Sequence, residues 1–138
     1  MRELEGLAAI VTGAARNIGR AIALDLAEGG ASLAVVTKSN MEGANAVTKE
    51  IESKGGKAIA LQADISDPAS VKKMVEEAAA NLGRIDILVN NAGVRPESPL
   101  EDLSWEEWRS VQGVILDGAF LCSQAVLAHI EKNGQGAI

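Results

Sequence analysis

The sequence predicts an α/β protein built on a doubly wound parallel sheet, and three observations support this fold class. Apolar runs alternate with amphipathic helical patterns along the whole chain of 138 residues, which is typical of a parallel sheet covered by helices. A glycine-containing turn at Thr12-Gly13 joins the first run to the first helical pattern. The content of 47% hydrophobic and 23% charged residues is ordinary for a globular domain.

Four short apolar runs are expected to form the strands of this sheet. They cover residues 7–11, 32–37, 57–63 and 85–90. Runs that are apolar throughout, rather than alternating, are typical of parallel strands buried on both faces. Residues 134–138 look like the entry to a fifth strand.

The first two helical patterns each follow a strand. In the first helix, Ile18, Ala21, Ile22 and Leu26 fall on one face, which we expect to point inward. The second helix is expected over residues 41–54. Its expected inward positions are Ala44, Val47 and Ile51.

The last two helices carry clear start signals. Asp67 is a suitable N-cap and Pro68 a suitable first helical residue. The fourth helix opens with the capping-box spacing at Ser104 and reaches about residue 132. Trp105 and Trp108 are expected to pack its start. The expected buried stripe of the third helix is Val71, Met74, Val75, Ala78 and Leu82.

The turn after the first strand is suited to an anionic ligand. Glycine lets the backbone bend sharply and approach a ligand closely, and a helix start offers free N–H groups and a partial positive charge to a pyrophosphate. The spacing from Gly13 to Gly19 differs from the common G-x-G-x-x-G fingerprint. Asn17 accepts positive φ better than most residues. The alternative interpretation is a plain tight turn.

Composition excludes several classes of partner. A formal net charge of −6 argues against nucleic acid or an anionic membrane, since both require basic patches. The apolar runs look shorter than a membrane span. The single cysteine, Cys122, excludes an internal disulfide and fits a reducing cytoplasm, where we expect the protein to act. Cys122 is expected to be a small core residue.

Four motifs fall in order on these elements. The Thr12-Gly13 turn follows the first strand, Asp64-Ile65 follows the third, and Asn90-Asn91-Ala92-Gly93 closes the fourth. Trp108 and residues 116–120 lie in the last helix. Together the motifs resemble the N-terminal, cofactor-binding half of the short-chain dehydrogenase/reductase family, in particular its 3-oxoacyl-acyl-carrier-protein reductase-like members. Asn17 stands where that family usually has a glycine.

The resemblance implies a dinucleotide-binding Rossmann-type domain over residues 1–138, truncated relative to the family. Together with the right-handed crossover rule it implies the strand order 3-2-1-4. It gives Asp64 the role of accepting from the adenine amino group and places residues 90–93 beside the ribose. The cofactor-binding residues that it implies are Gly13, Arg16, Asn17, Ile18, Gly19, Thr37, Lys38, Ser39, Asp64, Ile65, Asn90, Ala92 and Gly93.

The end of the second strand is expected to select the cofactor. An acid there would bind the ribose 2′-hydroxyl of NAD and repel a 2′-phosphate, but residues 37–40 contain no acid. Lys38 and Arg16 offer positive charge, and Ser39 offers a hydroxyl. NADP is therefore favoured over NAD. The alternative for Lys38 is a solvated loop lysine.

The catalytic groups of the family are missing from this sequence. The family uses Ser, Tyr-x-x-x-Lys and usually an Asn, and here the sequence has no tyrosine and Ile115 stands at the Asn position. No catalytic residue and no metal site is predicted. A small-molecule substrate is expected only where the second half of the fold is present.

Three interpretations remain at this stage. The first is the N-terminal half of an NAD(P)-dependent oxidoreductase, inactive alone and expected to form homo-oligomers. The second is a short non-catalytic protein that binds a dinucleotide, or a partner through its last helix. The third is a methyltransferase-like Rossmann domain, which needs an acid after the second strand and is disfavoured by Thr37-Lys38.

Overall fold

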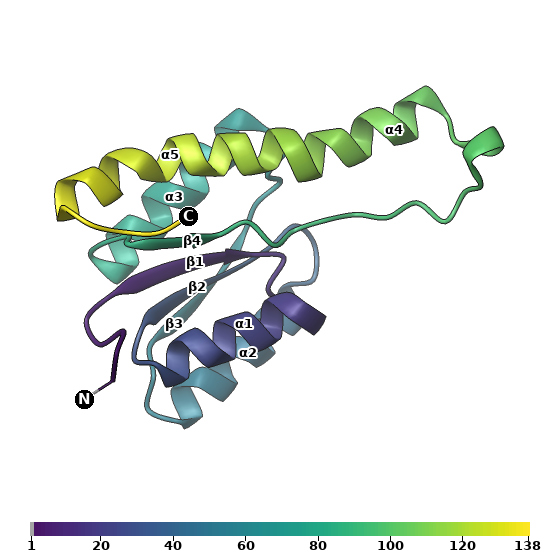
Figure 1. Ribbon diagram of the computed structural model, residues 1–138. Coiled ribbons are helices and arrows are strands. Elements are labelled where there is room, and N and C mark those ends of the chain that lie inside the picture. The colour runs from purple at the N-terminus through teal and green to yellow at the C-terminus, as the bar shows by residue number, and fades with distance from the viewer. Residues whose placement is uncertain (1) are drawn as a thin grey trace.

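The computed structural model describes residues 2–138, and a parallel sheet lies at its centre between two layers of helices (Figure 1). Its strands are β1 (Ala8–Thr12), β2 (Ser32–Thr37), β3 (Ala58–Gln62) and β4 (Ile87–Val89). They lie in the order β3-β2-β1-β4, and every pairing is parallel. The predicted fold class and strand order are confirmed.

Helices cover both faces of the sheet. On one face lie α1 (Asn17–Glu28) and α2 (Met41–Ser53). On the other lie α3 (Pro68–Leu82) and one long helix made of α4 (Trp105–Gln112), a π-helical turn (Gly113–Asp117) and α5 (Gly118–Asn133). A short 3-10 turn (Leu100–Asp102) precedes α4.

The side chains on the two faces of β1 pack into two separate hydrophobic cores. Ala8 and Ile10 pack with α3 and α5, whereas Ala9 and Val11 pack with α1 and α2. Every residue of β1 is buried, as its apolar run predicted. The inward residues predicted for α2 and α3 are all buried.

The inward face of α1 differs from the prediction. Its buried residues are Gly19, Ala23 and Ala27, while Ile18 is 71% exposed. Small residues let α1 approach the sheet closely, and a pattern of large apolar residues does not detect such a face. Of the predicted stripe, Ile22 and Leu26 are half-buried and Ala21 is exposed.

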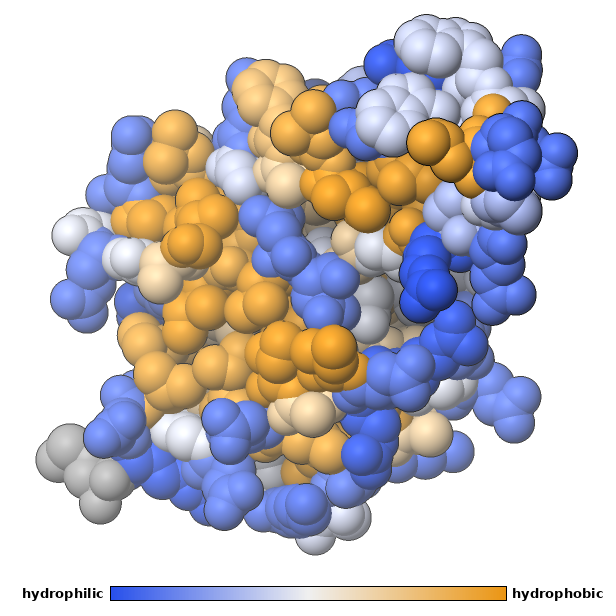
Figure 2. Space-filling model, turned by 45° about the vertical axis from the view of Figure 1, so that its right-hand side comes forward, coloured by the Kyte–Doolittle hydropathy of each residue, from blue (hydrophilic) through white to orange (hydrophobic). Residues whose placement is uncertain are grey.

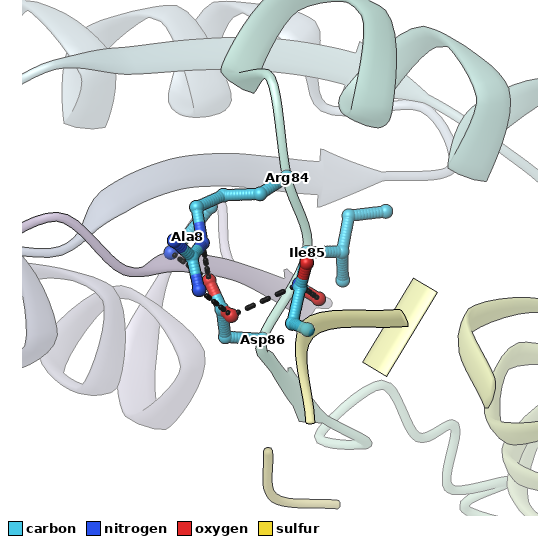
Figure 3. A network of polar contacts seen from close by, with 5 residues as sticks. Ala8, Arg84, Ile85 and Asp86 are labelled. Carbon is cyan, nitrogen blue, oxygen red and sulfur yellow. Dashed lines mark hydrogen bonds and ion pairs between the residues drawn. The ribbon is translucent and has the colours of Figure 1, made fainter. Parts of the chain in front are cut away.

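A polar network joins the start of β1, the approach to β4 and the end of α5 (Figure 3). Both carboxylate oxygens of Asp86 accept from Arg84 at 2.7 Å, and one of them accepts from the Ala8 N–H at 2.9 Å. The Asn133 amide donates to Asp86 at 3.0 Å and to the Ile85 carbonyl at 2.9 Å. Asp86 is almost fully buried, and these bonds compensate for its burial.

The predicted fourth strand is corrected at its start, and the predicted entry to a fifth strand is present. β4 begins at Ile87 rather than at residue 85, and the Ile85 carbonyl and the Asp86 carboxylate accept hydrogen bonds in the network. Beyond α5, Ala137 makes a parallel bridge with Ile87. The predicted entry to a fifth strand is therefore present at the β4 edge.

The start of the long helix is more exposed than its sequence predicted. Trp105 is 69% exposed and Trp108 47% exposed, so the two side chains do not pack into a core. The helix from Trp105 to Asn133 is long and apolar enough to cross a membrane by length and composition, which corrects the expectation that no segment reaches that length. A single such helix is weak evidence of a membrane span; 17% of its apolar window is buried, and Cys122 and Val126 lie in the core.

Candidate functional site

The main cavity lies at the carboxyl ends of the parallel strands, with a volume of about 520 Å³. Ligands of open α/β sheets bind at this edge, where the strand order reverses. Every residue named above as cofactor-binding lines this cavity except Asn90. Residues from the turns after β1, β2, β3 and β4 thus meet in one place although they are far apart in the sequence.

The turn after β1 needs its glycine. Gly13 has a φ of +63°, and a Cβ there would lie 2.8 Å from the Ala92 Cα. Asn17 has a φ of 51° and is the non-glycine residue with positive φ among residues 2–138, as the sequence predicted it could be. A Cβ on Gly19 would collide with the Gly13 carbonyl oxygen and the Asn91 side chain. The two glycines are therefore required for the turn to pack closely against the end of β4 and the start of α1.

Thr12 and Asn91 fix this turn to the end of β4. The buried Thr12 hydroxyl accepts from the Asn91 N–H at 3.1 Å and the Ala92 N–H at 3.0 Å. The Asn91 side-chain amide donates to the carbonyls of Thr12 at 2.9 Å and Gly13 at 3.1 Å. Asn91 was not named among the site residues, although it lies within the motif at residues 90–93. It holds the turn directly through these bonds and also lines the cavity.

The start of α1 faces the cavity without a side-chain cap. Arg16 is the N-cap residue, in an extended conformation, and makes no capping hydrogen bond. Arg16, Asn17 and Ile18 all line the cavity. Uncapped N–H groups at a helix start can bind an anion such as a pyrophosphate.

Residues that follow β2 and β3 form another part of the cavity wall. The Lys38 ammonium pairs with the Asp64 carboxylate, with Nζ and Oδ2 2.9 Å apart. Hydrogen bonds from Ser66 and the adjacent Lys38 hold the pKa of Asp64 below its usual value despite partial burial. Residues 37–40 place no carboxylate here, so Asp64 is the acid in this part of the wall.

Asn90 lies outside the main cavity. It lines a second hollow of about 260 Å³, beside Ile115, and its amide donates to the Ser123 hydroxyl at 3.2 Å. Ile115 belongs to the π-helical turn, a feature that is frequent at functional sites. The residues that line this hollow include no ionisable side chain.

Sequence reasoning also missed the residues that close the cavity. Ser110 and Val114 reach it from the long helix. Gly118 allows that helix to come close, because a Cβ there would lie 2.6 Å from the Ile65 Cδ1. These contacts depend on the path of the long helix across the cavity, which the sequence pattern does not predict. The remaining lining residues that were not named are Ala15, Val36, Asn40, Ala63 and Val94.

Cys122 is a core residue, as predicted. Its thiol is buried, and burial raises its pKa to about 11, so it stays protonated and unreactive near neutral pH. Within residues 2–138, no three His, Cys, Asp or Glu side chains are grouped as metal ligands would be.

The family follows from a direct comparison. A family model described as short chain dehydrogenase matches residues 7–138. The chain belongs to this family. An uncharacterized oxidoreductase of Methylorubrum extorquens is 42% identical over 97% of the chain and 54% of the relative. A 3-oxoacyl-acyl-carrier-protein reductase of Staphylococcus aureus is 42% identical over 94% of the chain and 53% of the relative.

Solved structures of the short-chain dehydrogenase family share the fold. A short-chain dehydrogenase from Burkholderia cenocepacia, solved in complex with NADP, has a TM-score of 0.89 and 41% identity over 93% of the chain and 52% of the solved protein. A putative short-chain alcohol dehydrogenase from Sinorhizobium meliloti has a TM-score of 0.92 and 40% identity over 99% and 54%. The chain spans about half the length of the curated relatives it matches.

Proposed function

We propose that this chain is the NADP-binding part of an oxidoreductase that transfers hydride between a nicotinamide and a carbonyl or alcohol carbon. One observation carries the proposal: the phosphate-type turn, with Arg16, and the acid-free end of β2, with Lys38, border the same cavity. The Burkholderia cenocepacia relative in complex with NADP supports the same cofactor. NAD is the less favoured cofactor.

The residues present fit a dinucleotide. The N–H groups at the start of α1 have no side-chain cap and would bind the pyrophosphate, and Gly13 and Gly19 allow the close packing that shapes this turn. Arg16, Lys38 and Ser39 would contact the 2′-phosphate through charge-assisted hydrogen bonds. Asp64 and Ile65 would border the adenine, with Ala92 and Gly93 beside the ribose. When bound, NADP supplies the hydride acceptor of the reaction, and this chain holds and orients it.

Calorimetric titration with NADPH and NADH tests the proposal. We expect NADPH to bind more tightly to the wild-type chain, and Arg16→Ala to weaken NADPH more than NADH because it removes one phosphate contact. Arg2→Ala is the matched control, since Arg2 lies beside a different hollow. Equal or tighter binding of NADH to the wild type would contradict the proposed selectivity.

A second function is favoured by the exposed face of the long helix. Leu116 is 64% exposed and Phe120 61% exposed. Such apolar side chains suit a non-catalytic protein that binds a partner through this helix. Binding of NADPH in the calorimeter separates the two functions, because a protein that acts only through the helix has no need of it.

We also propose that the chain associates with further copies of itself and acts in the cytoplasm. Apolar exposure on the long helix supports association. The single buried thiol of Cys122 suits a reducing compartment.

A further inference from the structure

The cation best placed for a 2′-phosphate already has a partner in the protein. Lys38 follows β2 and Asp64 follows β3, and their ion pair joins these neighbouring strand ends at the wall of the cavity. The Lys38 side chain is 67% exposed and that of Asp64 34% exposed. Both groups are therefore accessible to a ligand in the cavity.

The two side chains of the ion pair differ in how firmly the protein holds their charged groups. Asp64 is held in place, because its Oδ1 accepts from the Ser66 N–H at 3.0 Å and the Ser66 hydroxyl at 2.6 Å. The Ser70 hydroxyl accepts from the Asp64 N–H at 2.9 Å. Lys38 is anchored at its carbonyl oxygen, which accepts from the Gln62 amide at 2.9 Å. Its four-carbon stem leaves the ammonium free to exchange one oxyanion for another.

We propose that Asp64 is a specificity-determining residue that competes with the cofactor's 2′-phosphate for Lys38. This rests on the proposed function. A 2′-phosphate carries more negative charge than a carboxylate, so it takes the ammonium over when NADPH binds. NADH offers only a hydroxyl, and the Lys38–Asp64 pair persists. Asp64 therefore weakens the binding of NADPH selectively and limits the discrimination that Lys38 provides.

A double-mutant cycle on the full chain tests the competition. Dissociation constants of NADPH and NADH are measured for the wild type, Asp64→Asn, Lys38→Met and the double variant. We expect Asp64→Asn to raise the NADPH preference about two- to fivefold, the range of an exposed ion pair. In the Lys38→Met background we expect the same substitution to leave the preference unchanged. Asp25→Asn, an exposed carboxylate away from the cavity, is the matched control.

The NADPH preference is the ratio of the dissociation constants of NADH and NADPH. Any contribution of Asp64 that affects the binding of both cofactors equally cancels in this ratio. Where binding is weak, NMR titration with 2′,5′-ADP and 5′-AMP gives the same ratio for the adenosine end alone. The ratio measured for Asp64→Asn is meaningful when the variant is folded, and an NMR spectrum of the variant tests this.

Each outcome decides the proposal. A lower NADPH preference in Asp64→Asn means that Asp64 orients Lys38 for the phosphate. An unchanged NADPH preference means that the ion pair has no effect on cofactor choice. Either result overturns the proposed competition for Lys38. An equal rise in the Lys38→Met background means direct repulsion of the phosphate by Asp64, which also overturns it. Failure of the wild type to bind any of these ligands rejects the proposed function itself.

Discussion

Thr12 links the phosphate-type turn to the end of β4 through one buried hydroxyl. Thr12→Val removes the acceptor shared by the N–H groups of Asn91 and Ala92. We expect the free energy of unfolding to fall by about 1–3 kcal/mol, the usual cost of leaving buried donors unsatisfied. Thr12→Ser keeps the hydroxyl and is the control. Urea titration measures both, and equal stability of the two variants would contradict this role.

Lys38 is expected to set the preference between cofactors. Lys38→Asp places a negative charge where the 2′-phosphate would bind and offers an acceptor to a ribose hydroxyl, so we expect the preference to change from NADPH to NADH. Lys72→Asp makes the same charge change on an exposed face of α3 and should leave the preference alone. Competition calorimetry measures the ratio, and an unchanged ratio would refute the assignment of Lys38.

At single residues, the sequence predicted backbone requirements better than side-chain partners. Positive φ at Asn17 was expected because its residue type allows it, and the structure has it. The Lys38–Asp64 pair was not expected, because it depends on two strand ends being neighbours and on the reach of one lysine. Asn91 lines the cavity but was missed, because its hydrogen bonds to the turn depend on the end of β4 lying beside the turn after β1.

Among the elements, patterns of large apolar side chains predicted α2 and α3 correctly and α1 incorrectly. The packed face of α1 consists of glycine and alanine, which carry little signal in a hydrophobic pattern. The pattern of apolar side chains also did not predict the π-helical turn at Gly113–Asp117. It changes the rotation of the long helix by a fraction of a turn, and apolar spacing alone does not resolve such a change.

The network around Asp86 makes the junction of β1, β4 and α5 sensitive to acid. Burial alone would raise the pKa of Asp86, but hydrogen bonds from Arg84 and the Ala8 N–H lower it below the usual value. A lowered pKa means that the stabilisation is present above the unfolded pKa of about 3.9 and is lost as the pH falls through the folded value.

Asp86→Asn tests this pH dependence. We expect the stability difference between wild type and variant to be constant from about pH 5 to 7 and to shrink below about pH 4. Urea unfolding across this range measures it, with Asp25→Asn as the exposed control. A difference that stays constant down to about pH 2 would show that the charge of Asp86 is not responsible.

On the scale of the whole molecule, one face presents a broad hydrophobic area (Figure 2). The largest exposed apolar side chains lie mainly on the long helix and include Leu116, Phe120 and Leu127. Within β4, Ile87 and Val89 are half-buried, so the helix exposes more apolar surface than the strand.

This exposed helix face predicts self-association of residues 1–138. Exposed apolar patches of this kind promote contacts between protein molecules. We expect Phe120→Glu to reduce the mass measured by light scattering at high micromolar concentration. Gln124→Glu, at an exposed position on the same helix, is the control for added charge. A monodisperse wild-type monomer would contradict the prediction.

The residues that line the hollow beside Ile115 also bear on whether residues 1–138 alone can catalyse hydride transfer. Reduction of a carbonyl needs a proton donor within about 3 Å of its oxygen. The hollow beside Ile115 has no ionisable side chain in its wall, and the sequence has no tyrosine to serve as the donor. Positioning alone can supply several kcal/mol of the barrier, but it does not supply the proton.

We therefore expect no turnover above background from residues 1–138 alone, even where NADPH binds. The test follows NADPH absorbance with ketones, quinones and β-keto thioesters at high protein concentration. Lys38→Asp is the control, since it is expected to weaken NADPH binding at an exposed residue without changing the core. Steady oxidation that follows the protein peak through two columns and falls in Lys38→Asp would contradict the prediction. Such a result would require the proton to come from solvent, because the wall beside Ile115 offers no ionisable donor.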